Sequence, residues 1–351
     1  MSDVRIGFVG VGSMGQMAHL RNYVHIDGCQ VVALAELRPK TARAVADRYG
    51  IARVYGDHRE MLAAEQLDGV VASQPFAAHF ALLPKLYRHV KHVFTEKPLA
   101  VSVAAGESLA RAAAAAGCVH MVGYHKRSDP ATEHARAVID EWTRTGRMGS
   151  LRYVRITMPP GDWIAGGFVG LLKANDPAPE LPAEPKPADM SDEVYKAYVS
   201  FVNYYIHQIN LMRHLLGEPY KVTHVDRAGI LLVVESRSGV SGVIEMAPYQ
   251  TTVDWQESAL IAFDRGYIVL GLPAPLAVNR CGTVEVYSDP GDGATPEHRQ
   301  PVLPPTHAMR RQAENFVRVC RGEMDPPCDA AEAVDDLRIA RDTIQMRYEG
   351  V

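Results

Sequence analysis

The chain has 351 residues, of which 47% are hydrophobic and 22% are charged, a composition typical of a globular protein with two domains. The formal net charge of −4 gives no attraction to nucleic acid or to an anionic membrane, and no apolar run is long enough to cross a bilayer. The five cysteines are dispersed and the histidines form no H-E-x-x-H or H-x-H pattern, so the sequence predicts neither disulfides nor a metal site. The first strand follows the N-terminus directly, without room for a signal peptide, and we expect a cytoplasmic protein.

The first predicted element is a short buried strand, Arg5–Val9, followed by a glycine-rich turn and a helix that opens at Ser13. The turn has the pattern Gly10-x-Gly12-x-x-Gly15. In dinucleotide-binding folds the first glycine permits a tight turn, the second lets the backbone approach a pyrophosphate, and the third lets the helix pack closely on the strand. The unpaired N–H groups at the start of the helix then suit a phosphate. The pattern therefore predicts a dinucleotide site.

The next predicted strand, Val31–Ala35, ends in an acidic residue, Glu36. It lies about 20 positions beyond the glycines, where a ribose diol needs a hydrogen-bond acceptor. A carboxylate there repels the 2′-phosphate of NADP, which favours NAD. Arg38, two residues further on, could instead hold that phosphate, so NADP stays an open alternative.

Strands and helices alternate up to residue 124, with strands expected at 53–55, 69–73, 91–95 and 119–123 and helices at 41–49, 58–65, 76–89 and 104–116. This alternation predicts a parallel sheet with helices on both faces. Ligands of such sheets bind at the carboxyl ends of the strands. The candidate residues all fall at such ends: Gly10–Gly15, Glu36, Gln74-Pro75, Glu96-Lys97-Pro98 and Tyr124-His125.

The pattern changes after Tyr124. A helix is expected at 131–144, a strand at 150–158 and one long helix at 193–216, which Ser191 begins and Gly217 ends. Between them, residues 159–190 are rich in proline and glycine. So long a loop is usually functional. We interpret it as a cover over the site, with a surface insertion as the alternative.

The C-terminal part predicts strands between 221 and 272 with turns at 227–229, 236–239 and 264–266, an extended stretch at 276–286, a polar loop at 289–305, and helices at 307–321 and 330–347. The short turns require antiparallel pairing. The expected fold is therefore α/β: a doubly wound Rossmann domain over residues 1–124, and a substrate-binding and oligomerisation domain over 125–351 with a large, open, mainly antiparallel sheet. The open face of that sheet predicts self-association.

Lys97 is a candidate for proton handling, because it stands at a strand end between Glu96 and Pro98. A lysine there can donate to a substrate oxygen, and a nearby nicotinium charge would lower its pKa. The alternative is a solvated lysine paired with Glu96.

His207 is a second candidate. Asn203, His207, Asn210 and His214 recur at helical spacing and share one face of the predicted long helix. Histidine titrates near neutrality and suits general acid–base chemistry, although a core histidine bonded to a backbone carbonyl is the alternative. Asn203 cannot act as a base, but it can orient a hydroxyl or the imidazole.

These residues together resemble the Gfo/Idh/MocA family of glucose–fructose oxidoreductase, inositol dehydrogenase and rhizopine-catabolism proteins. The resemblance covers essentially the whole chain and rests on these stretches: Val9–Gly15, Pro75 with His79, Glu96-Lys97-Pro98, Arg127, Asn203–His207, Leu215–Glu218 and Cys328–Asp342. It implies a Rossmann domain, a nicotinamide cofactor, a sugar or polyol substrate, and homodimers or homotetramers. It also implies catalytic roles for Lys97 and His207.

The sequence departs from the family pattern at two positions. Many members carry Asp four residues before the histidine, where this chain has Asn203, and a carboxylate is common where it has Asn210. The expected acid–histidine relay is therefore weaker, and Lys97 and His207 would have to manage the proton with Asn203 in support.

Two sets of binding residues follow from the strand ends and the resemblance. The expected cofactor-binding residues are Gly10, Gly12, Ser13, Met14, Gly15, Glu36, Arg38, Gln74, Pro75, His79, Glu96 and Lys97. The expected substrate-binding residues are His125, Arg127, Asp162, Trp163 and Tyr204, because a flat aromatic face stacks well on a sugar ring. For each of this second set, ordinary packing is the alternative.

The expected reaction passes a hydride between nicotinamide and a secondary hydroxyl or ketone of a sugar, glycoside or cyclitol. Two other readings stay open. One is a redox-neutral NAD-using glycosidase or epimerase-like enzyme, and the other is a non-catalytic sugar- or NAD-sensing regulator. Relatives of the regulatory kind tend to lack the lysine that this chain has at Lys97.

Overall fold

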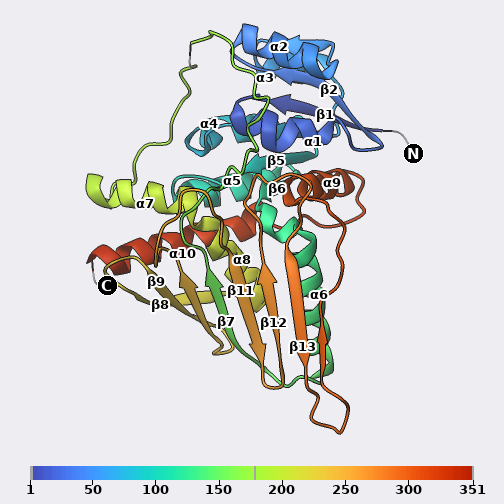
Figure 1. The fold of residues 1–351 in the computed structure, drawn as a ribbon. Helices are drawn as coiled ribbons and strands as arrows, with labels where there is room; N and C mark the ends of the chain where they lie inside the picture. Colours follow the sequence, from blue (N-terminus) through green and yellow to red (C-terminus); the bar gives the residue numbers. More distant parts are fainter. Residues whose placement is uncertain (1–2, 178, 350–351) are drawn as a thin grey trace. The chain divides into compact units, whose positions relative to one another are not determined.

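A computed structural model describes residues 3–177 and 179–349. By contacts between Cα atoms the chain divides into two compact units, each with its own sheet (Figure 1). The first unit contains residues 1–124, 167–190 and 312–337, and the second contains 125–166, 191–311 and 338–351. The stretch 125–351, expected to be one domain, is thus interrupted twice by segments that pack with the first unit.

The first unit is built on a parallel sheet of six strands in the order β3-β2-β1-β4-β5-β6. The strands are β1 (Val4–Val9), β2 (Cys29–Ala35), β3 (Arg53–Tyr55), β4 (Gly69–Ala72), β5 (His92–Glu96) and β6 (Val119–Gly123). From the central pair β1 and β4, the strand order runs outward to β3 on one side and to β6 on the other, as in a doubly wound fold. The parallel Rossmann sheet expected from the sequence is confirmed.

Helices connect these strands, as the alternating pattern predicts. They are η1 (Gly15–Leu20, wound as a π-helix), α1 (Arg21–Tyr23), α2 (Pro39–Tyr49), α3 (His58–Ala64), η2 (Phe76–Ala78), α4 (His79–Tyr87) and α5 (Val103–Ala115). Asp57 caps α3 by accepting hydrogen bonds from the N–H groups of Arg59 and Glu60. The sequence-based boundaries differ from these by at most two residues.

The core of the first unit explains why a C-terminal helix returns to it. Phe8, Leu34, Val71 and Phe94 are buried side chains from four neighbouring strands. Phe316, on helix α9 (Ala308–Cys320), is fully buried in the same cluster, with its ring centroid 5.7 Å from that of Phe94. Burying a phenylalanine of this kind contributes about 1.5–3 kcal/mol, so the first unit draws part of its stability from the end of the chain.

The second unit is built on an eight-stranded sheet in the order β14-β13-β12-β11-β7-β10-β9-β8. Its strands are β7 (Leu151–Thr157), β8 (Tyr220–Val225), β9 (Leu231–Ser236), β10 (Ser241–Glu245), β11 (Ser258–Phe263), β12 (Gly266–Gly271), β13 (Thr283–Ser288) and β14 (Glu297–Arg299). All pairs are antiparallel except β7 with β10. The expected open, mainly antiparallel sheet is confirmed, and β14 is a short strand inside the stretch expected to be a loop.

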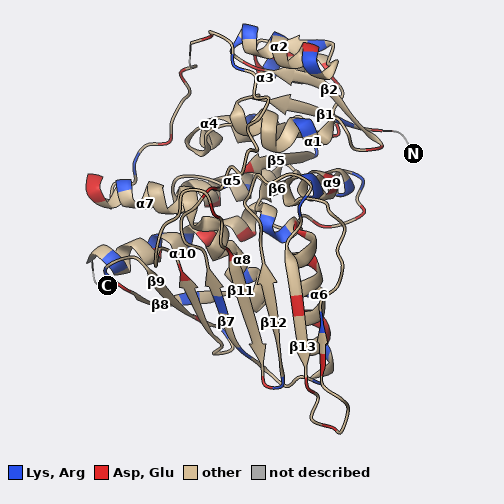
Figure 2. Cartoon of the chain, in the orientation of Figure 1, with Lys and Arg blue, Asp and Glu red and all other residues tan. Residues whose placement is uncertain are grey.

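Buried and half-buried positions alternate along these strands, so one face of the large sheet is buried and the other is only half-buried. Figure 2 shows charged residues along α2 and α6 (Pro130–Thr145), and strands β11 and β12 contain none. Tyr267 and Tyr287 stack on neighbouring strands with ring centroids 5.2 Å apart. The half-buried face is the one for which the sequence predicts self-association.

The single long helix expected at 193–216 is wrong, because the chain forms α7 (Asp192–Tyr204) and α8 (Ile206–Leu216) with a break at Tyr205. The Tyr205 carbonyl accepts from the N–H groups of both Gln208 (3.0 Å) and Ile209 (3.2 Å), a tighter turn than an α-helix makes. The Tyr205 hydroxyl also donates to the Met246 carbonyl, which ties the break to the end of β10. Ser191 caps α7 as expected.

Two further elements complete the fold. The short helix η3 (His125–Ser128) follows β6, and the helix α10 (Ala330–Glu349) follows α9. Within the described ranges, no helix is both long enough and apolar enough to span a membrane.

Candidate functional site

The glycine turn after β1 has the geometry that its pattern predicts. Gly10 has φ +84°, where residues with a side chain are strained, and a Cβ there would lie 2.5 Å from Nε2 of Gln74. A Cβ on Gly15 would lie 2.7 Å from the Gly10 carbonyl oxygen, so this glycine permits the close packing of helix on strand. Gly12 faces open space, with only Arg38 Nη2 within 4 Å of a Cβ at 3.8 Å. A ligand can therefore approach the backbone at Gly12.

A pocket of about 520 Å³ opens beside this turn at the carboxyl ends of β1, β2 and β4. Six of the residues predicted to bind the cofactor line it: Gly10, Gly12, Glu36, Arg38, Gln74 and Pro75. The opposite wall includes Asp57, Leu82 and residues 179–182. A volume of this size is typical of small-molecule sites.

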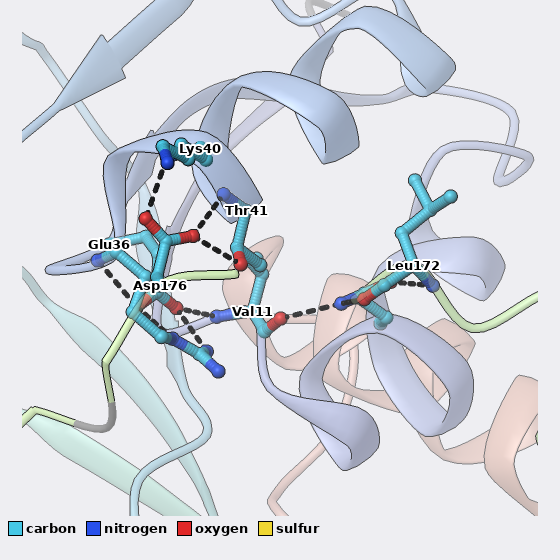
Figure 3. A network of polar contacts seen from close by, with 8 residues as sticks. Val11, Glu36, Lys40, Thr41, Leu172 and Asp176 are labelled. Carbon is cyan, nitrogen blue, oxygen red and sulfur yellow. Dashed lines mark hydrogen bonds and ion pairs between the residues drawn. The ribbon is translucent and has the colours of Figure 1, made fainter. Parts of the chain in front are cut away.

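Glu36 sits on the pocket wall, with all of its acceptor capacity used inside the chain (Figure 3). One oxygen accepts from the Arg38 N–H (3.1 Å) and Nε (2.9 Å), and the other from the Val11 N–H (2.8 Å) and Arg38 Nη2 (2.9 Å). Burial raises the pKa of Glu36, but these hydrogen bonds lower it by more, so the pKa lies below its ordinary value. The side chain is a charged acceptor for which a ribose diol would compete with Arg38.

The Glu-Lys-Pro motif stands at the carboxyl end of β5, the strand next to β4 in the sheet. Glu96 pairs through Oε1 with Nε2 of the buried His19 at 2.8 Å, and its Oε2 accepts weakly from the Lys97 N–H at 3.3 Å. Burial raises the pKa of Glu96, but the bond from His19 outweighs it and the pKa is lowered. Glu96 is thus committed to His19, and Lys97 stands half-buried at the strand end, before a cis peptide bond to Pro98.

The remaining predicted cofactor residues occupy different places. Ser13 lines a second cavity of about 170 Å³, which shares Gly12 and Arg38 with the main pocket. Met14 lies in the first turn of the helix that follows the glycines. His79 is completely buried, and its Nδ1 lies 2.9 Å from the Leu99 carbonyl oxygen. Burial lowers the pKa of His79, as expected for a core histidine.

The proline-rich stretch, expected as a cover or a surface insertion over 159–190, is fastened to the first unit along residues 167–184; residue 178 lies outside the described residues. The Gln16 amide binds the Leu172 N–H (3.1 Å) and carbonyl (3.0 Å), as Figure 3 shows for Leu172. Further along, the Glu184 carboxylate accepts from the N–H groups of Val101 and Ser102, both at 2.9 Å. Between these anchors, residues 179–182 line the main pocket.

In the second unit the structure brings together His125 and His207, whose ring centroids lie 4.5 Å apart in an edge-to-face arrangement. His125 is buried and belongs to η3, whereas His207 is half-buried at the start of α8. The sequence assigned these two residues to separate roles, and their contact was not foreseen. Lys97 belongs to the first unit and His207 to the second.

Arg127 and Asn210 form a buried contact in which Arg127 Nε donates to Asn210 Oδ1 at 2.6 Å. Asn203 lies on α7, before the break, and is exposed. Asn203 and His207 therefore belong to two helices rather than to one continuous face. The amide oxygen of Asn210 accepts from an arginine, as a carboxylate at this position also could.

The loop residues expected to bind substrate lie near Tyr204. The Tyr204 hydroxyl accepts from the Gly161 N–H at 3.4 Å, just before Asp162 and Trp163. The Asp162 carboxylate accepts from the N–H groups of Ile164 and Ala165, both at 3.0 Å, and so shapes the turn. The Trp163 carbonyl accepts from the Leu276 N–H at 3.2 Å.

A buried charged cluster in the second unit was missed by the sequence analysis. Lys126 Nζ lies 2.5 Å from Glu257 Oε2, and Gln208 Nε2 donates to Glu257 Oε1 at 2.8 Å. Both charged side chains are at most 5% exposed. Lys126 and Gln208 each adjoin a predicted site residue, His125 or His207, but Glu257 lies far away in sequence and no spacing could have linked it to them. Among the described residues, no group of three His, Cys, Asp or Glu side chains is arranged to hold a metal ion.

Comparison with known proteins bears on the first unit. Residues 4–124 match the GFO_IDH_MocA model, described as an oxidoreductase family with an NAD-binding Rossmann fold. This part of the chain is therefore similar to the NAD-binding domain of that family. An inositol 2-dehydrogenase from Rhizobium meliloti (strain 1021) is 25% identical to it over 330 residues, which cover 90% of this chain and 88% of that protein.

Solved structures share the fold over the whole chain. An oxidoreductase domain protein from Kribbella flavida aligns with a TM-score of 0.76 and 20% identity, over 100% of this chain and 98% of its own. An oxidoreductase from Agrobacterium radiobacter, in complex with NAD+, L-tartaric acid and magnesium, aligns with a TM-score of 0.71 and 15% identity, over the same shares of the two chains. At these identities the likeness concerns the fold.

The pocket of the first unit fits NAD, the cofactor named for the family model that residues 4–124 match. Gly12 leaves the backbone open to a pyrophosphate, and the helix after it begins without a side-chain cap at Met14. Glu36 supplies a charged acceptor on the pocket wall at the place where a ribose would need it. Gln74 and Pro75 continue the wall at the end of the neighbouring strand β4.

Proposed function

We propose that the protein is an NAD-dependent oxidoreductase that transfers a hydride between nicotinamide and a secondary hydroxyl or ketone of a sugar, glycoside or cyclitol. The observation that carries this proposal is the pocket beside Gly12 and Glu36, in a chain whose residues 4–124 match an NAD-binding oxidoreductase family. The carbohydrate or cyclitol substrate class is supported by the inositol 2-dehydrogenase relative.

The roles proposed for the chain's own residues follow from their positions. Gly10, Gly12 and Ser13 would hold the pyrophosphate and Glu36 the adenosine ribose, while Lys97 at the end of β5 would donate to the substrate oxygen. Bound NAD supplies the hydride acceptor. His207 would take the hydroxyl proton while the Lys97 ammonium stabilises the developing oxyanion.

Two features of the second unit support His207 in this role. Its ring packs edge-to-face against the ring of the buried His125, with 4.5 Å between the ring centroids, at the start of α8. Asn203, the exposed residue four positions earlier, would orient the substrate hydroxyl. The surrounding polar groups, Arg127 and Tyr204, would then contact the other hydroxyls of the substrate.

The test is a substrate panel with purified protein, in which absorbance of reduced nicotinamide is followed with NAD or NADP and a set of sugars, glycosides and inositols. We expect reduction of NAD with one class of compound and a slower reaction, or none, with NADP. Silence across the panel, together with no binding of either nucleotide by calorimetry, would overturn the proposal.

A redox-neutral cycle is the second candidate, and the fastening of the 167–184 segment favours it. Residues 179–182 line the cofactor pocket between anchors at Gln16 and Glu184, and a segment held in this way would slow the exchange of a bound dinucleotide. A cofactor that exchanges slowly suits an enzyme that reduces it again in the same cycle. Product formation without accumulation of reduced nicotinamide would identify this case.

For the assembled protein we propose a homodimer or homotetramer through the half-buried face of the large sheet. Apolar side chains such as Val233 and Leu260 occupy outward positions on that face without being fully buried. Exposed apolar faces of this kind are typical of interfaces. Light scattering on the purified protein would give the number of subunits directly.

A further inference from the structure

Helix α2 begins beside the cofactor pocket without a cap from its own N-cap residue. Arg38 stands at the N-cap position, its side chain is bonded to Glu36, and the first turn contains no acidic residue. Pro39 has no N–H group, and the Ala42 N–H bonds the Arg38 carbonyl at 2.8 Å. The N–H groups of Lys40 and Thr41 are therefore the ones in this turn that need an acceptor from elsewhere.

Asp176, which is 135 residues from Thr41 in sequence, supplies that acceptor (Figure 3). Its Oδ1 accepts from the Lys40 N–H at 3.2 Å, and its Oδ2 accepts from the Thr41 N–H and from Thr41 Oγ1, both at 2.8 Å. These bonds outweigh the effect of desolvation, so the pKa of Asp176 lies below its ordinary value and the group is an anion at neutral pH. The donors around it form a position built for an anion.

This anion position borders the cofactor site. Asp176 and Thr41 line the cavity of about 170 Å³ together with Gly12 and Arg38, and both of these last two residues also line the main pocket. The Arg38 guanidinium, which the sequence offers as a partner for a 2′-phosphate, is already bonded to Glu36. Two carboxylates, Glu36 and Asp176, thus lie close to the Arg38 guanidinium.

We propose that Asp176 is a specificity-determining residue, whose carboxylate occupies the position that the 2′-phosphate of NADP would take and thereby selects NAD. The inference rests on the cofactor site proposed above. Without Asp176, the N–H groups of Lys40 and Thr41 and the Thr41 hydroxyl would be open to a phosphate, close to the Arg38 guanidinium. With Asp176 in place, its negative charge would repel the 2′-phosphate of NADP, and those donors would already be hydrogen-bonded to the carboxylate.

A purely structural reading gives Asp176 the task of capping α2 and anchoring the 167–184 segment. The two readings differ in one measurable quantity, the ratio of the dissociation constants for NADP and NAD. A lost cap would weaken both cofactors alike, because they share every group except the 2′-phosphate. A lost charge at the phosphate position would change that ratio.

The experiment measures binding of NAD and of NADP by calorimetry to the wild type, to Asp176→Asn, which keeps the shape and removes the charge, and to Asp176→Ala. Asp47→Asn is the matched control, because it removes an exposed carboxylate from helix α2, whose first turn Asp176 caps. We expect the wild type to prefer NAD. Asp176→Asn should shift the ratio towards NADP by at least about tenfold, and the control should leave it unchanged.

A further variant tests the position itself. Adding Thr41→Val to Asp176→Asn removes one donor of the proposed phosphate site. The double variant should bind NADP more weakly than Asp176→Asn does. An unchanged ratio in Asp176→Asn, or an equal weakening of both cofactors, would overturn the inference while leaving the NAD site intact. A wild type that binds neither nucleotide would overturn the proposed function as well.

Discussion

The carboxylate of Glu36 and the guanidinium of Arg38 are joined by two hydrogen bonds of 2.9 Å on the wall of the cofactor pocket. The group expected to hold the adenosine ribose is therefore engaged within the chain before any ligand arrives. This pairing bears on the choice of cofactor and on its affinity.

We expect opposite effects from removing the two partners of this pair. Glu36→Ala deletes a charged acceptor and should weaken NAD binding about ten- to hundredfold. Arg38→Ala removes the competitor for that acceptor and should leave NAD affinity equal or higher. Calorimetric titration with NAD measures both, and a loss of NAD affinity in Arg38→Ala as large as in Glu36→Ala would contradict the ribose role of Glu36.

The buried side chain of Gln16 is one of the anchors of the 167–184 segment. Gln16 binds both the N–H and the carbonyl of Leu172 and also the Val11 carbonyl at 2.8 Å. Gln16→Ala should speed hydrogen exchange of the Leu172 amide about ten- to hundredfold, because its acceptor is lost. Lys173→Ala, exposed on the same segment, is the control and should leave that rate unchanged. Equal rates in wild type and Gln16→Ala would show that other contacts hold the segment.

The buried pair Lys126–Glu257 should be costly to break from one side. Lys126→Met leaves the Glu257 carboxylate buried with Gln208 as its remaining partner, and we expect the free energy of unfolding to fall by about 3–5 kcal/mol. Lys126→Met combined with Glu257→Gln removes the uncompensated charge and should be less unstable than the single variant. Chemical denaturation of wild type, both single variants and the double variant measures this, and simple additivity would rule out coupling between the two residues.

Asp129 predicts a pH dependence of stability with a definite sign. Burial raises its pKa from the usual 3.8 to about 6, although it accepts hydrogen bonds from the N–H groups of Ala131 and Gly282. Between these two pH values the unfolded chain releases the proton before the folded one does, so the contribution of Asp129 to stability falls as pH rises and is lost above about pH 6.

The matching variant is Asp129→Asn, which keeps an acceptor at the start of α6 and cannot ionise. The thermal midpoint of Asp129→Asn minus that of wild type should be larger at pH 8 than at pH 4 by several degrees, at about 2–4 °C for each kcal/mol. Midpoints that differ from wild type by the same amount at both pH values would mean that Asp129 does not titrate in this range.

Much of the fold and of the cofactor site was predictable from short sequence patterns. The glycine turn, the strand ends and Glu36 depend on short stretches whose residue types dictate backbone geometry, and the structure gathers them in one pocket. The turns of the antiparallel sheet were predictable for the same reason. The break at Tyr205 was not, because it depends on a bond from the Tyr205 hydroxyl to the distant Met246 carbonyl.

Contacts over long distances in sequence account for most of what was missed. His19 with Glu96, Gln16 with Leu172 and Thr41 with Asp176 join residues 77, 156 and 135 positions apart. No periodicity or spacing encodes such pairs, since they follow from how complete elements pack. The return of residues 312–337 to the first unit is of the same kind, and the burial of Phe316 is its physical reason.

We propose that this chain oxidises or reduces its substrate with bound NAD and with Lys97 and His207 as proton-handling residues. The most direct test measures reduced nicotinamide formed by wild type, Lys97→Met and His207→Ala with the substrate found in the panel, alongside NAD affinity by calorimetry. The account predicts turnover lowered about 10²- to 10⁴-fold in each variant, with NAD affinity within a few-fold of wild type. Near-normal turnover in Lys97→Met or in His207→Ala would contradict it.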